Sequence, residues 1–183
     1  MGRGEIPVVV VSGAPGTGKS TLGRLLARRL RAALIDQDVA TQPLVDVIQR
    51  LVGIDDLDDE RLAGLTRAAR YEAIAALAVD NLKAGRPVVL VGPYTVERAD
   101  QESWAALAAR LVAAGGTPVL VWLWLEPAEL GRRLQRRSAD RDRAKPAGGA
   151  LRSTSAPPVV PHLALAADRP ADALAAEVQA ALR

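Results

Sequence analysis

The chain has 183 residues, of which 49 % are hydrophobic, and its formal net charge is +3 at pH 7. These values fit one globular domain and leave too little length for two comfortable ones. Cysteine is absent and His162 is the only histidine, which excludes disulfides, thiol chemistry, a histidine metal cluster and a serine–histidine relay. Aromatic residues are 3 %, so a base-stacking nucleic-acid surface is not expected.

The longest apolar run, residues 118–125, is too short to span a bilayer. A signal peptide is not expected, because the first apolar run continues directly into the glycine-rich segment. We therefore expect a cytoplasmic protein without membrane contact, and a monomer or homodimer for its size.

The first predicted element is a buried strand over residues 6–11, followed by a glycine-rich segment and a helix over residues 22–30. The segment has the pattern G-x-x-x-x-G-K-S, known as Walker A. Backbone N–H groups and the positive end of the helix hold phosphate oxygens there, Lys19 supplies charge for the terminal phosphates, and Ser20 offers a hydroxyl to Mg²⁺. The expected phosphate-binding residues are Gly13, Ala14, Pro15, Gly16, Thr17, Gly18, Lys19, Ser20 and Thr21. By itself the motif does not distinguish phosphate transfer from hydrolysis or sensing.

Further strands and helices alternate along the rest of the chain. Strands are predicted over residues 33–35, 87–91, 119–125 and 162–166. Helices are predicted over residues 43–52, from the acidic run 55–60 to residue 84, and over 101–114, 129–137 and 171–182, with a loop over 138–158. This alternation indicates an α/β fold with a parallel sheet covered on both faces.

Polar residues follow the predicted strands, where ligands bind in sheets of this kind. They are Asp36 and Asp38 after the second strand, Tyr94, Thr95, Glu97 and Arg98 after the third, Glu126 after the fourth, and Asp168 and Arg169 after the fifth.

The chain resembles the small P-loop kinases, a group that includes adenylate, gluconate and adenylylsulfate kinases, zeta-toxin-like kinases and polynucleotide kinases. The resemblance rests on residues 13–21, 34–38, 88–95 and the arginines of 133–142, and covers nearly the whole chain. It implies a single P-loop kinase-like domain over residues 1–183. The implied fold is the three-layer P-loop NTPase fold with a five-stranded parallel sheet and an arginine-bearing lid over about residues 128–158. It also implies ATP and Mg²⁺ as cofactors.

Two carboxylates, Asp36 and Asp38, follow the second strand. In similar kinases a carboxylate here faces the transferred phosphoryl group and accepts or orients the proton of the attacking hydroxyl. The register of the resemblance favours Asp38 for this catalytic and substrate-binding role. The alternative is that both residues simply cap the following helix.

An arginine cluster is the second feature of the resemblance. Arg133 and Arg137 lie one turn apart on a predicted helix and share a face, and Arg141 follows. The resemblance implies that Arg133, Arg137 and Arg169 contact the nucleotide, and that Arg137 and Arg141 neutralise charge on the transferring phosphoryl group. The alternative is a solvated basic helix face.

The third predicted strand departs from the pattern of many P-loop proteins, because Val91 is followed by Gly92-Pro93-Tyr94 and not by an aspartate. Mg²⁺ is therefore expected on Ser20, on nucleotide oxygens and on Asp36, with Asp38 as the other possibility. The missing carboxylate argues against a motor-type ATPase and is compatible with a kinase.

By analogy, the acceptor site lies between the long helix before the third strand and the loop after it. The expected substrate-binding residues are Asp38, Arg70, Tyr71, Tyr94, Thr95 and Arg98. The cations there would suit an anionic acceptor; alternatively, Arg67 and Arg70 pair on the surface with the acidic run 55–60. The three tryptophans, Trp104, Trp122 and Trp124, are expected in the core.

The sequence thus predicts an enzyme, an ATP-dependent phosphotransferase that moves the γ-phosphoryl group to a hydroxyl of a small-molecule or nucleotide-type acceptor. The alternative is a nucleotide-dependent switch or partner-binding ATPase. Polynucleotide 5′-kinase and toxin-like kinase activities are lesser alternatives.

Overall fold

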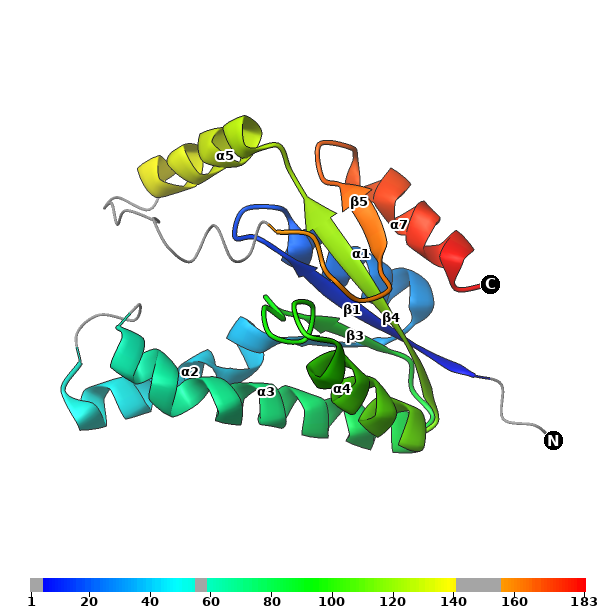
Figure 1. The fold of residues 1–183 in the computed structure, drawn as a ribbon, viewed down its shortest axis with the longest axis horizontal. Coiled ribbons are helices and arrows are strands. Elements are labelled where there is room, and N and C mark those ends of the chain that lie inside the picture. Colours follow the sequence, from blue (N-terminus) through cyan, green and yellow to red (C-terminus); the bar gives the residue numbers. More distant parts are fainter. Residues whose placement is uncertain (1–4, 55–58, 141–155) are drawn as a thin grey trace.

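The computed structural model describes residues 5–54, 59–140 and 156–183, without the side chains of 137–140. Five parallel strands form one sheet in the order β2-β3-β1-β4-β5 (Figure 1). The strands are β1 Ile6–Gly13, β2 Ala33–Asp36, β3 Val88–Val91, β4 Gly116–Trp124 and β5 Leu163–Ala166. The predicted α/β class and five-stranded parallel sheet are confirmed.

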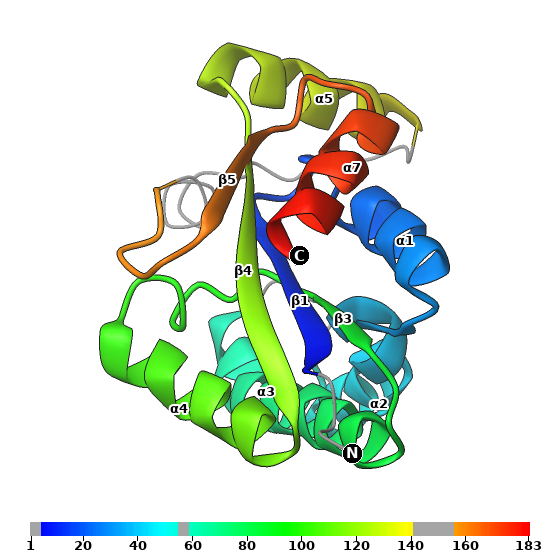
Figure 2. The same ribbon diagram turned by 90° about the vertical axis from the view of Figure 1, so that its right-hand side faces the viewer.

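Helices cover both faces of this sheet (Figure 2). The helices α1 Lys19–Leu30 and α7 Ala171–Ala181 pack on one face, and α3 Glu60–Lys83 and α4 Gln101–Ala113 pack on the other. The central strand shows why: Val9 and Val11 belong to the core shared with α1 and α7, whereas Val8 and Val10 face α3 and α4. Alternate side chains of a strand point to opposite faces, so a strand covered on both sides is apolar throughout.

Two further helices stand at the edges of these layers. Helix α2 Gln37–Val52 lies against α3, and α5 Pro127–Asp140 follows β4 at the carboxyl ends of the strands (Figure 1). The strands β1, β2 and β4 are followed along the chain by α1, α2 and α5 respectively. Because the strands are parallel, the turns after them lie at the same edge of the sheet.

Helix α2 begins earlier than predicted. The sequence suggested a start at Pro43, because proline is favoured in the first turn of a helix. In the structure Asp36 caps a helix that begins at Gln37, and Pro43 lies inside it. Because proline has no backbone N–H, the helix lacks one hydrogen bond at Pro43. The earlier start places Asp38 within the helix.

Strand β4 and helix α5 also extend beyond their predicted bounds. Strand β4 begins at Gly116 and includes Pro118, which is tolerated because β5 pairs with β4 only from Val121 onward. Helix α5 continues to Asp140 through residues predicted as loop. Residues 141–155 of the predicted lid, including Arg141, lie outside the described residues.

The predicted core tryptophans differ in their burial. Trp122 is buried and stacks on Trp124, which is half-buried, and Trp104 is half-buried against the α3–α4 core.

Candidate active site

The phosphate-binding segment forms a tight turn between β1 and α1. Gly16 and Gly18 have φ angles of 86° and 91°, in the left-handed region that favours glycine. A Cβ on Gly13 would stand 2.4 Å from the backbone oxygen of Leu123, so only glycine fits there. The segment is thus folded into a backbone cradle at a helix N-terminus, the geometry that binds phosphate.

The Ala14 carbonyl oxygen organises the inside of this cradle. It accepts hydrogen bonds from the Thr17 N–H at 3.3 Å, the Thr17 hydroxyl at 2.8 Å and Lys19 Nζ at 2.9 Å. The Lys19 ammonium group therefore lies over the loop, close to the backbone N–H groups that would hold phosphate oxygens.

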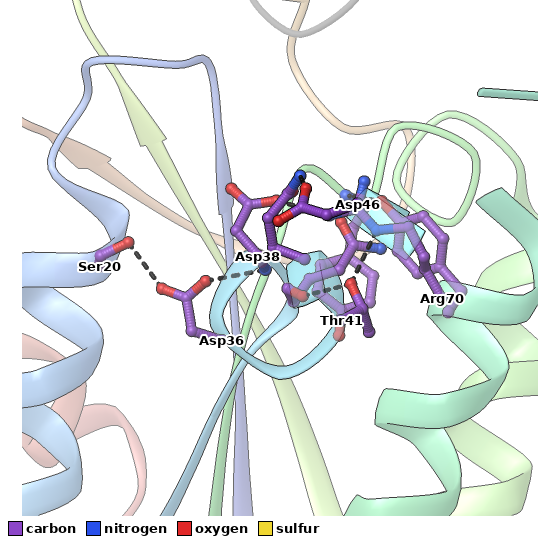
Figure 3. A network of polar contacts seen from close by, with 10 residues as sticks. Ser20, Asp36, Asp38, Thr41, Asp46 and Arg70 are labelled. Atoms are coloured by element: carbon purple, nitrogen blue, oxygen red, sulfur yellow. Dashed lines mark hydrogen bonds and ion pairs between the residues drawn. The ribbon is translucent and has the colours of Figure 1, made fainter. Parts of the chain in front are cut away.

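Ser20 and Asp36 connect the P-loop to the end of β2 (Figure 3). The Ser20 hydroxyl donates to Asp36 Oδ2 at 2.7 Å, and Asp36 Oδ1 accepts from the Asp38 N–H at 3.2 Å. One carboxylate thus caps helix α2 and also faces the P-loop hydroxyl. The two oxygen ligands predicted for Mg²⁺ lie side by side.

Asp38 lies in the first turn of α2 and forms an ion pair with α3. Arg70 Nη2 lies 2.7 Å from Asp38 Oδ1, and Arg70 Nε donates to the Thr41 hydroxyl at 2.8 Å (Figure 3). The Asp38 side chain is 81 % exposed whereas that of Arg70 is 22 % exposed. Arg70 therefore fixes a carboxylate that remains open to a ligand. Residues 55–58 of the acidic run, the alternative partners of Arg70, lie outside the described residues.

One cavity of about 820 Å³ contains the P-loop and both carboxylates. Its lining residues come from four segments: Pro15, Gly16, Gly18, Lys19, Ser20, Thr21 and Arg24; Asp36, Gln37 and Asp38; Val91, Gly92 and Pro93; and Arg133. A nucleotide phosphate chain in the cradle and a hydroxyl near Asp38 would share this space.

The loop after β3 is held by buried aromatic residues. Tyr94 is 1 % exposed, has a φ of 45°, and donates its N–H to the Tyr71 hydroxyl at 2.9 Å. The two rings meet edge-on with centroids 5.3 Å apart. Burial raises the pKa of the Tyr71 hydroxyl to about 12. Burial is also the main cause of the raised pKa of the nearby Glu97 carboxyl. Tyr71 of α3 thus anchors the loop after β3 through Tyr94.

The other expected acceptor residues already have protein partners. Arg67 Nη2 donates to the Thr95 hydroxyl. Arg98 is 2 % exposed, its Nη1 donates to the Ala156 carbonyl at 2.9 Å, and its own carbonyl accepts from the Val159 N–H at 2.8 Å. Arg98 thus fastens the loop after β3 to the segment before β5, and its guanidinium group is not open to solvent.

On the opposite side of the P-loop, Arg133 lines the cavity from α5. Its guanidinium group bonds to Glu129 Oε1 at 3.0 Å and to the Ala167 carbonyl at 3.1 Å, which holds it between α5 and the end of β5. Arg169 pairs instead with Glu177 of α7 at 2.8 Å. Arg137 is in α5, but its side chain is not described.

Sequence reasoning missed three residues of this region. Arg24 lines the cavity four positions after Ser20, so the i, i+4 spacing of the P-loop helix could have indicated it. Gln37 stands between the two predicted carboxylates, and Thr41 accepts from Arg70. Both were missed because the helix was expected to begin only at Pro43.

The site fits Mg²⁺ in a specific way. In the described ranges, no group of three histidine, cysteine, aspartate or glutamate side chains could by itself hold a metal. Ser20 and Asp36 supply two adjacent oxygen atoms, which suits an ion that keeps several waters and takes its remaining ligands from phosphate oxygens. If Mg²⁺ binds here, its protein carboxylate would come from Asp36 of β2, since β3 ends without one.

Together, the parallel sheet, the glycine cradle and the carboxylates after β2 define a P-loop nucleotide-binding protein of the kinase type. Residues 8–153 match the model of an AAA domain family (AAA_33), and the chain belongs to this family.

Solved structures share the fold over almost the whole chain. An APS kinase of Mycobacterium tuberculosis has a TM-score of 0.67 at 21 % identity, covering 97 % of this chain and 98 % of that one. A gluconokinase of Sinorhizobium meliloti has a TM-score of 0.60 at 20 % identity, covering 95 % and 90 %. These neighbours show the fold that the resemblance to the P-loop small-molecule kinases predicted, and both are named as kinases.

Matches to curated proteins are shorter. A shikimate kinase of Corynebacterium efficiens is 62 % identical over 32 residues, which is 18 % of this chain and 19 % of the relative. A bifunctional pantoate ligase/cytidylate kinase of Gloeobacter violaceus is 45 % identical over 64 residues, 35 % of this chain and 12 % of the relative. The chain spans less than a quarter of the length of these relatives. No helix in the described parts of the chain has the length and apolar character needed to cross a membrane.

Proposed function

We propose that the protein is an ATP-dependent kinase that transfers the γ-phosphoryl group to a hydroxyl of a small-molecule acceptor. The observation that carries this proposal is the position of Asp38. Its carboxylate is exposed, is held by Arg70, and lines the same cavity as Lys19 and Ser20. A carboxylate across from a phosphate cradle is the arrangement needed to orient an attacking hydroxyl.

In this reaction the acceptor oxygen forms a bond to the γ-phosphorus, the bond to the β-phosphate oxygen breaks, and ADP leaves. Asp38 accepts the hydroxyl proton. Lys19 and the backbone N–H groups of the cradle stabilise charge on the phosphates, and Arg133 borders the cavity from α5. Mg²⁺, held by Ser20 and Asp36, would neutralise phosphate charge when bound. Roles for Arg137, Arg141 and Arg169 remain part of the proposal.

A kinase must also keep water away from the γ-phosphate. Helix α5 stands beside the cradle, where Leu134 and Leu130 are the nearest side chains to the position of a Cβ on Gly16. This apolar contact supports a role for α5 as the wall that separates the phosphates from solvent. The switch or partner-binding alternative gains no comparable support, because β3 ends without a carboxylate.

The proposal is tested by incubating the protein with Mg-ATP and a panel of hydroxyl metabolites while ADP release is followed. We expect acceptor-dependent turnover well above basal hydrolysis, reduced at least 100-fold by Asp38→Asn with ATP binding retained. Asp46→Asn is the matched control, because Asp46 lies on the same helix, bonds to Gln42 and does not line the cavity. Acceptor-independent hydrolysis that survives Asp38→Asn would contradict a kinase.

A further inference from the structure

The arginines expected to recognise an acceptor already have partners in the structure. Arg67 is bonded to Thr95, Arg70 to Asp38 and Thr41, and Arg98 is buried against Ala156. A guanidinium group in such a position orders the protein around it. Another cation must therefore serve an anionic group in the cavity, if one binds.

Arg24 has the properties that the expected arginines lack. It lines the cavity, it is exposed, and it makes no hydrogen bond or ion pair with any of the residues that the structure describes. Arg133, the other arginine that the described residues contribute to the cavity lining, is bonded to Glu129 and Ala167. A lone arginine facing a polar cavity presents its planar set of donors to a ligand.

The position of Arg24 on α1 assigns it to the acceptor side. Residues four apart on a helix share a face, and Ser20 points from this face toward Asp36 at the end of β2. Arg24 lies one turn farther from the P-loop, about 5 to 6 Å along the helix. It therefore shares a helix face with Ser20, whose hydroxyl contacts Asp36, and it lines the same cavity as Asp36 and Asp38.

We infer that Arg24 is a specificity-determining residue that binds an anionic group of the acceptor, a carboxylate or a phosphate, while Asp38 receives the acceptor hydroxyl. Asp36 and Asp38 both line the cavity, and their carboxylates would repel an anionic acceptor. A hydroxy acid or phosphorylated alcohol therefore needs a cation in the same cavity, and Arg24 supplies it. Guanidinium and carboxylate or phosphate groups form paired, charge-assisted hydrogen bonds. This inference rests on the proposed kinase function and narrows its substrate class.

The first experiment measures binding without catalysis. Protein saturated with Mg-AMPPNP is titrated calorimetrically with gluconate and shikimate, and with their neutral counterparts glucitol and methyl shikimate. We expect at least one anion to bind at least tenfold more tightly than its neutral counterpart. Arg24→Gln should weaken anion binding roughly ten- to hundredfold and leave neutral binding unchanged, and Arg24→Lys should recover part of the loss. An anionic phosphate group is covered by adding glycerol 3-phosphate, paired with glycerol.

Arg28→Gln is the matched control, because Arg28 lies one turn farther along α1, is exposed and does not line the cavity. It should behave like the unchanged protein. The second experiment follows ADP release with the same compounds. For Arg24→Gln we expect a KM for the anionic acceptor raised at least tenfold, with the KM for ATP within about twofold of that of the unchanged protein.

The outcomes separate the two proposals. Arg24-dependent anion binding without any phosphoryl transfer supports this inference and contradicts the kinase function. Transfer without a preference for anions, or equal losses in Arg24→Gln and Arg28→Gln, overturns the role of Arg24 alone. If Arg24→Gln weakened ATP binding as much as it weakened anion binding, Arg24 would be a nucleotide-binding residue and the inference would be overturned. Failure of every compound to bind would also overturn it.

Discussion

On the donor side of the cavity, residues 13–21 form one continuous segment whose shape is set by glycine backbone angles and a helix N-terminus. On the acceptor side, Asp38 and Arg70 come from different helices, 32 positions apart in the chain. The donor side is a local structure that its own sequence specifies. The acceptor side forms only when α2 and α3 pack together, so it depends on tertiary structure. Substitutions on these two helices can therefore change the acceptor side without changing the P-loop.

The largest expected effect is on the donor side. Lys19→Ala removes the charge of the cradle, and we expect acceptor-dependent turnover to fall by about 10³-fold, because the charge on the transferring group loses its main protein cation. The measurement is ADP release at saturating acceptor. Lys83→Ala, at the exposed end of α3, is the control and should retain full activity. Near-normal turnover in Lys19→Ala would show that the cradle is not the donor site.

The backbone character of the cradle can be tested by stability. Gly13→Ala places a Cβ 2.4 Å from a backbone oxygen, and we expect the free energy of unfolding to fall by about 3 kcal/mol. Gly64→Ala is a contrasting control, because no atom lies within 4 Å of its Cβ and the residue is helical. It should raise stability by up to about 1 kcal/mol. Urea unfolding measures both, and equal effects would contradict the close approach.

The acceptor side should respond to Arg70→Gln. Asp38 would lose the partner that fixes it, and we expect kcat/KM for the acceptor to fall roughly ten- to hundredfold while the KM for ATP stays within about twofold. Arg61→Gln is the control on the same helix, where Arg61 pairs with Asp59 at the exposed start of α3. If both kinetic constants changed together, the two sides of the cavity would not be separable.

The smallest expected effect concerns Glu97 in the loop after β3. Burial raises the pKa of this carboxyl, so the folded state holds its proton to higher pH than the unfolded state. Stability from this group is therefore present at low pH and is lost as the pH rises through the folded-state pKa. Glu97→Gln should remove this decline and leave the protein slightly more stable at pH 8, as measured by urea unfolding at several pH values. An unchanged pH profile would contradict it.

The same contrast explains what the sequence could predict. The sheet and the phosphate cradle follow from local patterns: a valine run, the Walker A spacing, and helices and strands in alternation. Ser20 and Asp36 were predicted as Mg²⁺ ligands, and the structure places their side chains within hydrogen-bond distance of each other; the metal role stays a prediction. The partners of Arg67, Arg70 and Arg98 could not be predicted, because a charged side chain can reach several neighbours and only the packed helices decide among them. The start of α2 was missed because Pro43 resembles a first-turn residue, and Asp36 overrides that signal by capping the helix.

Asp36 divides its two oxygens between the Ser20 hydroxyl and the Asp38 backbone N–H. A ligand on the donor side that draws this carboxylate toward itself also alters the support of the helix that bears Asp38. Thermodynamic linkage then requires reciprocity: nucleotide binding changes acceptor affinity by the same factor by which acceptor binding changes nucleotide affinity. A single side chain of β2 would thus couple the affinities of the two substrates, whichever of them binds first.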